Sequence, residues 1–222
     1  MEEQFKVALF DVDGTLVDSE GQYSVFWGEM GRRYHPEMPN FSDVIKGTTL
    51  TQILDRYFPK EDHEEIVKEL YAYEAQMKFD FVDGAEAFVR DIRKRGVKCA
   101  VVTSSNEQKM EYLRRCIPYF DELFDKVLTA EMFTASKPNP DCYLLGAKVF
   151  GANVEECVVF EDALTGLEAG MRAGMFTIGF PTTNAREVIE SKCSVVADSF
   201  KELNYDEVVK LKRNFSSNSS LI

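Results

Sequence analysis

The sequence predicts an α/β fold, a doubly wound and mostly parallel sheet, with an α-helical domain inserted after its first strand. Two observations lead to this prediction. Short apolar runs alternate with amphipathic segments along most of the chain, and this alternation stops between residues 18 and 81. The chain has 222 residues, of which 45% are hydrophobic, so it can bury a core and still carry a smaller insert.

Five apolar runs are predicted strands. Each is too short for a helix, and none shows the polar alternation of a half-solvated sheet, so they are typical of strands buried on both faces. They are KVALF (6–10), VKCAVV (97–102), CVVF (157–160), MFTIG (175–179) and SVVA (194–197). Helices are predicted between them, at 85–95 before Gly96, at 106–116 after the capping residues Ser104 and Ser105, and at 141–150 after Asn139 as the cap and Pro140 at the first helical position.

The segment 18–81 shows three helical patterns and no strand pattern. Aromatic and aliphatic residues repeat at helical spacing around Phe26, around Leu54 and around Leu70, where the third stripe extends to Met77, and we interpret these stripes as packing surfaces. The predicted domains are therefore an α/β core at 1–17 and 82–222 and a helical cap at 18–81. The polar end, 214–222, is predicted to be a frayed tail.

Composition disfavours several classes of partner. Lys and Arg number 26 against 38 Asp and Glu, a net charge of −12, which argues against nucleic acid and anionic membranes. The five cysteines form no CxxC pair and suit a reducing cytosol. The first residues lack the features of a signal peptide, and no apolar run comes near ~18 residues, the length of a membrane span. We expect a cytoplasmic protein; the oligomeric state stays open, with a monomer as the expectation.

Acidic and hydroxyl side chains follow three of the predicted strands. Asp11 and Asp13 follow KVALF, Thr103 and Ser104 follow VKCAVV, and Glu161 and Asp162 follow CVVF. Open α/β sheets bind ligands beyond the carboxyl ends of their strands, so we expect these side chains to gather at one edge. Two carboxylates about 4 Å apart repel by roughly 4 kcal/mol at an effective dielectric constant of about 20, so four acids together predict a cation. A set of oxygen ligands favours Mg²⁺.

The spacing of Asp11 and Asp13 suggests a reaction. Side chains two residues apart on an extended backbone leave the same face, so one carboxylate can attack a phosphorus while the other reaches the leaving oxygen. Gly14 leaves room for the backbone to approach a ligand closely. Lys137 lies in SKPNP (136–140), a loop stiffened by two prolines, from which its ammonium could bridge Asp11 and a substrate oxygen.

These four elements, in this order, resemble the haloacid dehalogenase superfamily. The stretches FDVDGTLVDS (10–19), KPNPDCY (137–143) and VVFEDALTGLEAGMRAG (158–174) are similar to the branch of β-phosphoglucomutase-like phosphatases. The resemblance covers nearly the whole chain, and the insert after the first motif is similar to the helical cap of that branch. It implies a Mg²⁺-dependent phosphatase on a Rossmann-like core.

The resemblance also implies roles for the matching acids. Asp11 would be the nucleophile that forms an aspartyl-phosphate. Asp13 would protonate the leaving oxygen and later deprotonate the hydrolytic water. The Asp11 carboxylate, the Asp13 backbone carbonyl and Asp162 would hold Mg²⁺, and Glu161 would be a ligand directly or through water.

The phosphoryl group and the rest of the substrate would have separate contacts. Thr103 and Lys137 would bind the phosphoryl group, together with the backbone N–H groups of residues 12–14, including Gly14, and of Ser104. The expected substrate contacts in the cap are Tyr23, Thr48 and Thr49. The sequence does not name the substrate.

Three alternatives differ in what the site does. Asp13 favours phosphate chemistry over dehalogenation, which needs no acid at that position. The phosphosugar mutases of the branch carry a His early in the first cap helix, where gapless counting puts Tyr23, and an Arg after a Gly in the cap, where KGTTL (46–50) has none. We therefore expect hydrolysis of a small phosphorylated metabolite, a sugar phosphate, with a β-phosphoglucomutase-type mutase as the alternative. A non-catalytic phosphometabolite-binding protein is the second alternative, although a binder has no use for Asp13.

Overall fold

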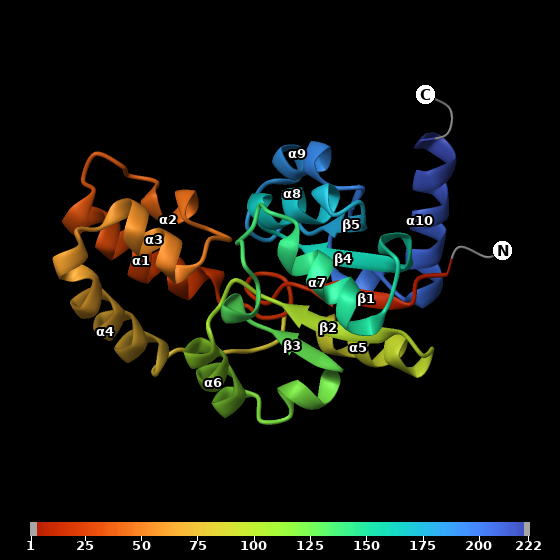
Figure 1. Cartoon of the computed structure of the whole chain (residues 1–222), viewed down its shortest axis with the longest axis horizontal. Coiled ribbons are helices and arrows are strands. Elements are labelled where there is room, and N and C mark those ends of the chain that lie inside the picture. Colours follow the sequence, from red (N-terminus) through yellow and green to blue (C-terminus); the bar gives the residue numbers. More distant parts are fainter. Residues whose placement is uncertain (1–3, 220–222) are drawn as a thin grey trace.

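A six-stranded sheet runs through the middle of the protein in the computed structural model, which describes residues 4–219 (Figure 1). All neighbouring strands are parallel, in the order β3-β2-β1-β4-β5-β6. The strands are β1 (Val7–Phe10), β2 (Lys98–Val102), β3 (Lys126–Leu128), β4 (Cys157–Glu161), β5 (Phe176–Gly179) and β6 (Val195–Val196). The chain winds outwards from β1 in both directions, so the predicted doubly wound α/β fold is confirmed.

The central strand β1 explains why the apolar runs are continuous. Its residue Leu9 is aligned with Ala100 of β2 and with Val159 of β4. Leu9 belongs to the hydrophobic cluster on one face of the sheet, and its neighbour Phe10 belongs to the cluster on the other face. Both faces are therefore buried, and every position of the strand needs an apolar side chain.

Helices cover both faces of the sheet. The helices α5 (Ala85–Lys94), α6 (Glu107–Cys116) and α10 (Tyr205–Ser219) add side chains to the cluster that contains Phe10. The helices α7 (Asp141–Phe150) and α8 (Leu164–Arg172) add side chains to the cluster that contains Leu9. The short helix α9 (Arg186–Ile189) packs against α8. Short 3-10 helices lie at Lys60–Asp62, Phe120–Leu123, Ala130–Met132, Val154–Glu156, Glu190–Lys192 and Phe200–Glu202.

Three local features differ from the sequence prediction. The edge strand β3 is missing from it, because its sequence KVL has only two apolar residues and does not form a recognisable apolar run. The N-cap residue of α6 is Asn106, whose side chain accepts a hydrogen bond from the N–H of Lys109 (3.0 Å). The predicted capping residues Ser104 and Ser105 do not have this role. Pro140 lies immediately before α7 rather than at its first helical position.

The helices between β1 and α5 pack into a cluster of their own, to one side of the sheet (Figure 1). They are α1 (Glu20–Tyr34), α2 (Phe41–Val44), α3 (Leu50–Tyr57) and α4 (His63–Glu74). Phe26, Leu54 and Leu70, one from each predicted stripe, are buried together in this cluster. Met77 lies beyond the end of α4 and packs into the core of the sheet domain instead. We call residues 18–81 the cap.

The chain enters and leaves the cap through two segments that lie side by side. The N–H of Asp18 donates to the carbonyl oxygen of Asp80 (3.0 Å), and the N–H of Val82 donates to that of Leu16 (2.9 Å). Val17 also forms an antiparallel bridge with the residue at position 81. The predicted cap boundaries, after residue 17 and before residue 82, fall within this paired segment.

The end of the chain differs from the prediction of a frayed tail. The helix α10 continues to Ser219, so residues 214–219 are helical, and residues 220–222 lie outside the described residues. The ring of Phe215 packs edge-on against Phe176 of β5, with centroids 5.6 Å apart, which ties this part of the helix to the sheet. Within residues 4–219, none of the helices has the length and apolarity needed to cross a bilayer.

Candidate active site

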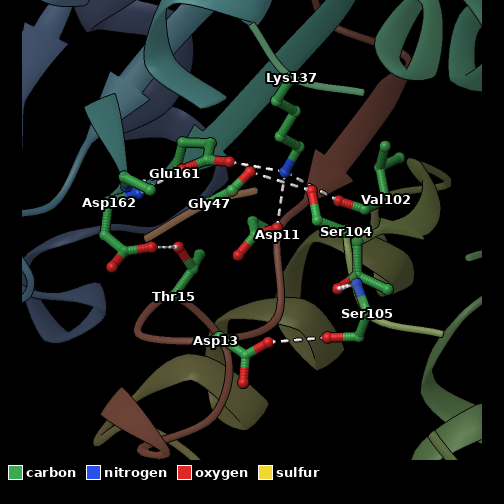
Figure 2. A network of polar contacts seen from close by, with 12 residues as sticks. Asp11, Asp13, Thr15, Gly47, Val102, Ser104, Ser105, Lys137, Glu161 and Asp162 are labelled. Atoms are coloured by element: carbon green, nitrogen blue, oxygen red, sulfur yellow. Dashed lines mark hydrogen bonds and ion pairs between the residues drawn. The ribbon is translucent and has the colours of Figure 1, made fainter. Parts of the chain in front are cut away.

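The carboxyl ends of three adjacent strands bring the predicted site residues together (Figure 2). Asp11 follows β1, Thr103 follows β2, and Glu161 ends β4 with Asp162 next to it. The N–H of Asp11 still donates to the carbonyl oxygen of Phe160 (3.0 Å), so the pairing of β1 with β4 continues one residue past β1. Adjacent strands are about 4.8 Å apart, so side chains that leave them at the same level come into contact.

The side chain of Lys137 lies at the centre of this edge. It is 1% exposed, and its Nζ donates to Oδ1 of Asp11 (2.6 Å), to Oε1 of Glu161 (2.7 Å) and to the carbonyl oxygen of Val102 (3.2 Å). Burial by itself would lower the pKa of Lys137, but the charges of Asp11 and Glu161 outweigh burial and raise the pKa well above its ordinary value. Lys137 therefore places a positive charge beside Asp11, in the contact expected from the sequence.

Three carboxylates at the same edge form a candidate cation site. Asp11, Glu161 and Asp162 each offer an oxygen, and these oxygens lie within 4.8 Å of one another. Burial raises the pKa of Asp11 to about 7 despite the opposing charge of Lys137. Burial and the charges of Glu161 and Asp11 raise the pKa of Asp162 well above its ordinary value. One lysine does not neutralise three buried acids, so this donor set fits a divalent ion with oxygen ligands such as Mg²⁺.

Glu161 is held by four hydrogen-bond donors. Its Oε1 accepts from Lys137 and from the hydroxyl of Tyr143 (3.0 Å). Its Oε2 accepts from the N–H groups of Asp162 (2.9 Å) and Ala163 (2.8 Å). These contacts orient Lys137 and the turn after β4. The predicted ligation of the ion by Glu161, directly or through water, stays a prediction.

Two glycines leave room for the buried acids. Gly14 has a φ of +75°, and a Cβ at this position would overlap the carboxylate of Asp162. The next residue, Thr15, donates its hydroxyl to Oδ1 of Asp162 (2.7 Å; Figure 2). On α8, a Cβ at Gly166 would overlap the carboxylate of Glu161. Both glycines therefore allow the backbone to pass close to the candidate cation site.

Asp13 faces a different set of donors. Its Oδ2 accepts from Nζ of Lys109 (2.5 Å) and from Oγ of Ser105 (2.9 Å), and its Oδ1 accepts from the hydroxyl of Ser19. Burial by itself would raise the pKa of Asp13, but the charge of Lys109 and these three hydrogen bonds outweigh it and lower the pKa. The side chain of Asp13 is therefore held as a carboxylate, outside the cluster of Asp11, Glu161 and Asp162. The part in metal binding predicted for Asp13 concerns its backbone carbonyl.

A cavity of about 110 Å³ lies between this edge of the sheet and the cap. The core lines it with side chains that include Asp11, Asp13, Thr103 and Ser104. The cap lines it with side chains that include Glu20, Tyr23, Trp27, Lys46, Thr48 and Glu74. The Oγ of Ser104 donates to the carbonyl oxygen of Gly47 (3.2 Å), so core and cap touch at the wall of the cavity (Figure 2).

One predicted cap contact lies away from the cavity. Tyr23 and Thr48 line it as expected, but Thr49 does not. The Oγ1 of Thr49 accepts from the N–H of Gln52 (3.4 Å) and caps α3, and it also accepts from Ser136 (3.4 Å). A Thr that immediately precedes a helix has this structural use, and Thr49 is not among the residues that line the cavity.

Sequence reasoning missed Lys109, Ser105 and Glu74. Ser105 and Lys109 contact Asp13 from the loop after β2 and from the first turn of α6. Ser105 is predicted only as a helix cap, and Lys109 carries no signal in the sequence. Glu74 does carry one: it follows Ile66 and Leu70 at four-residue spacing and so continues the buried stripe of α4. An acid on an apolar stripe indicates a buried polar contact.

The chain has relatives of known family. The family model described as haloacid dehalogenase-like hydrolase matches residues 8–180. The validoxylamine A 7′-phosphate phosphatase of Streptomyces hygroscopicus subsp. limoneus is 28% identical over 213 residues, covering 92% of this chain and 98% of that protein. Hexitol phosphatase A of Escherichia coli (strain K12) is 32% identical over 177 residues, covering 77% of this chain and 80% of that protein.

The fold is shared with solved structures. A β-phosphoglucomutase from Clostridium difficile matches with a TM-score of 0.80 at 21% identity, covering 96% of this chain and 100% of that one. The family match spans most of the chain, and it confirms both the predicted resemblance and the prediction of a hydrolytic enzyme. The chain therefore belongs to the haloacid dehalogenase-like hydrolase family.

Proposed function

We propose that this protein is a Mg²⁺-dependent phosphatase that hydrolyses a small phosphorylated metabolite, a sugar phosphate, through an aspartyl-phosphate on Asp11. One observation carries the proposal. Asp11 lies in the wall of a cavity, with one carboxylate oxygen bound to the buried Lys137 and with Asp13 two residues away in the same wall. The two relatives are named as a validoxylamine A 7′-phosphate phosphatase and a hexitol phosphatase, which supports a small phosphorylated metabolite as the substrate.

The acids behind the cavity would hold the ion. Asp11 and Asp162 would be ligands with the backbone carbonyl of Asp13, and Glu161 would bind directly or through water. When bound, Mg²⁺ supplies positive charge that screens a nucleophilic carboxylate from an anionic phosphate. Lys137 adds charge of the same sign at Asp11, and Thr103 and the N–H groups of residues 12–14 and of Ser104 would bind the phosphoryl oxygens.

The reaction proceeds in two displacements. In the first, a carboxylate oxygen of Asp11 forms a bond to phosphorus, and the bond between phosphorus and the ester oxygen breaks. The leaving oxygen keeps the electron pair of the broken bond and takes a proton from Asp13. In the second, a water attacks the aspartyl-phosphate, Asp13 accepts its proton, and the bond between phosphorus and Asp11 breaks to release phosphate.

Asp13 must change its hydrogen-bond partners during the catalytic cycle. Lys109, Ser105 and Ser19 stabilise its charged form, which is the form that accepts a proton from water. Protonation of the leaving oxygen needs the neutral acid, so Asp13 has to separate from Lys109 before the first displacement.

The mutase alternative has less support from the cavity. The position of the mutase His is occupied by Tyr23, whose hydroxyl donates to Glu74 (2.8 Å). The lysines of the cavity wall are already ion-paired, Lys46 with Glu20 and Asp43, and Lys109 with Asp13. No arginine is among the residues that line the cavity in the described part of the chain. A second phosphate would therefore lack the free cation that bisphosphate handling needs, which favours simple hydrolysis.

Turnover of p-nitrophenyl phosphate and of a panel of phosphorylated sugars, with Mg²⁺ and with EDTA, tests the proposal. We expect hydrolysis with Mg²⁺ and none in EDTA. Full activity in EDTA would contradict the role of the metal. Binding of phosphometabolites without any turnover would point to a binding protein, and conversion of β-glucose 1-phosphate to the 6-phosphate would support the mutase.

A further inference from the structure

The charged side chains on the cap side of the cavity are mostly paired with each other. Nζ of Lys46 lies 3.2 Å from Oδ1 of Asp43 and 3.5 Å from Oε2 of Glu20. Nζ of Lys109 contacts Asp13 and also lies 3.9 Å from the centre of the Tyr23 ring. Both lysines of the cavity wall are thus committed to acids of the protein.

Glu74 differs from these groups because it forms no ion pair with a residue between 4 and 219. Oε2 of Glu20 also accepts no hydrogen bond, but it lies 3.5 Å from Nζ of Lys46. Glu74 is the last residue of α4, it is only 3% exposed, and it lines the cavity. Its Oε1 accepts from the hydroxyl of Tyr23 (2.8 Å). Its Oε2 is buried and accepts no hydrogen bond from any residue between 4 and 219. Folded proteins rarely bury an acceptor without a donor, so this oxygen is available to a group that enters the cavity.

The surroundings of Glu74 select the chemistry of that group. A second phosphate or a carboxylate beside Glu74 would be repelled by Glu74 and Glu20, which line the cap side of the cavity. An ammonium would meet Lys46 and Lys109 in the same wall. A neutral hydroxyl avoids both conflicts, because it carries no charge and donates to the free carboxylate oxygen of Glu74.

The remaining wall of the cavity suits a carbon skeleton. Apolar side chains of the cap line this part of the cavity, namely Trp27, Ile45, Leu50, Ile53 and Leu70. Ring and methyl surfaces of this kind pack against the C–H face of a sugar or polyol and leave its hydroxyl groups for polar partners.

We propose that Glu74 recognises the leaving group of the substrate: its free carboxylate oxygen accepts a hydrogen bond from a hydroxyl of a neutral polyol or sugar, and its charge disfavours a second phosphate. This assignment rests on the proposed phosphatase function. It makes the enzyme selective for monophosphates of polyhydroxy compounds.

Three substrates of matched chain length test the assignment: sorbitol 6-phosphate, hexyl phosphate and sorbitol 1,6-bisphosphate. For the Glu74→Gln variant, we expect kcat/KM on sorbitol 6-phosphate to fall about 10- to 100-fold more than on hexyl phosphate, the usual effect of losing a hydrogen bond to a charged group. The ratio of kcat/KM for sorbitol 6-phosphate to that for sorbitol 1,6-bisphosphate should be smaller in this variant than in wild type. Differences in leaving-group pKa cancel, because each substrate is compared between the two enzymes.

Glu65→Gln is the matched control, since Glu65 is an exposed acid on the same helix. It should leave all three kcat/KM values unchanged. An equal loss on sorbitol 6-phosphate and hexyl phosphate in Glu74→Gln would show a structural role and overturn the assignment. If the variant does not fold, wild type alone decides: faster turnover of hexyl phosphate or of the bisphosphate than of sorbitol 6-phosphate contradicts the assignment. Failure of wild type on every phosphate ester, p-nitrophenyl phosphate included, would instead contradict the phosphatase function.

Discussion

The core side and the cap side of the cavity differ in how their buried carboxylates are hydrogen-bonded. On the core side, Asp11, Glu161 and Asp162 accept hydrogen bonds from Lys137, Tyr143, Thr15 and backbone N–H groups. On the cap side, Glu74 keeps one buried oxygen without a donor. The protein itself therefore holds the acids of the core side in place, whereas the free oxygen of Glu74 on the cap side is left for a donor from the substrate. The predictions that follow test this contrast.

The largest effect is expected for Asp11→Asn. The amide keeps the shape of the side chain but is not a nucleophile, so kcat should fall by at least about 10⁴-fold. Steady-state turnover of p-nitrophenyl phosphate measures the loss, and circular dichroism checks the fold. Asp18→Asn, an exposed acid nearby in the chain, is the control and should keep full activity. Substantial turnover by Asp11→Asn would remove Asp11 from the nucleophilic role.

The substitution Lys137→Met should lower the free energy of unfolding in EDTA by about 3–5 kcal/mol. It removes the positive charge and leaves Asp11 and Glu161 as uncompensated buried acids. Urea unfolding measures the difference. The loss should be smaller when Lys137→Met is combined with Asp11→Asn, since one of the unpaired charges is then gone. Lys126→Met, an exposed lysine of β3, should change stability little. Equal stability of Lys137→Met and wild type would mean that this ion pair does not hold the core side together.

The metal-free protein should lose stability as the pH rises from about 4 to about 7. Burial raises the pKa of Asp11 from 3.8 to about 7, so in this range the folded state binds a proton that the unfolded state has lost. The stability from this group is full below pH 3.8 and is lost as the pH rises through about 7, with a slope of at most about 1.4 kcal/mol per pH unit. The pKa values of Asp162, Glu20 and Glu74 are raised in the same way. The pKa of Asp13 is lowered below 3.8, so the stability that it contributes changes below this pH range.

Thermal unfolding in EDTA across this pH range measures the effect. The stabilisation by added Mg²⁺ should grow with pH, because the ion binds the ionised carboxylates. Asp11→Asn should flatten the pH dependence. A metal-free protein whose stability rises between pH 4 and 7 would contradict the placement of these acids.

The smallest effect is expected on the cap side, for Tyr23→Phe. It removes the hydroxyl that donates to Oε1 of Glu74 and should cost about 1 kcal/mol of stability. It should also reduce the preference for sorbitol 6-phosphate over hexyl phosphate, because Glu74 is then less firmly oriented. Tyr112→Phe, which lies outside the cavity lining, is the control. An unchanged substrate preference in Tyr23→Phe would show that Glu74 does not depend on this contact.

The sequence predicts the core side of the site much better than the cap side. Asp11, Thr103 and Asp162 directly follow buried strands, and parallel pairing places the carboxyl ends of these strands at one edge of the sheet. Lys137 is predictable from its proline-flanked loop before a helix. The contact between Lys109 and Asp13, by contrast, requires the orientation of α6 against the loop after β1, which no local pattern encodes.

The cap contacts show the same limit. Thr48 and Thr49 are adjacent and chemically identical, yet only Thr48 lines the cavity, because Thr49 caps α3. Glu74 continues the buried stripe of α4, which indicates a buried polar contact, but its partner Tyr23 follows only from the packing of the cap helices. Which polar side chains of the cap face the core depends on how helices pack across the cavity, and this is a tertiary property rather than a property of spacing.

The location of the covalent phosphoryl group tests the central claim most directly. Turnover of p-nitrophenyl phosphate with Mg²⁺ is stopped within milliseconds, the acyl phosphate is reduced with borohydride, and the modified residue is identified by mass spectrometry of peptides. We predict reduction at Asp11 and at no other acid of the site. Rapid turnover with Asp11 unmodified, or with the modification at Asp13 or Asp162, would contradict it.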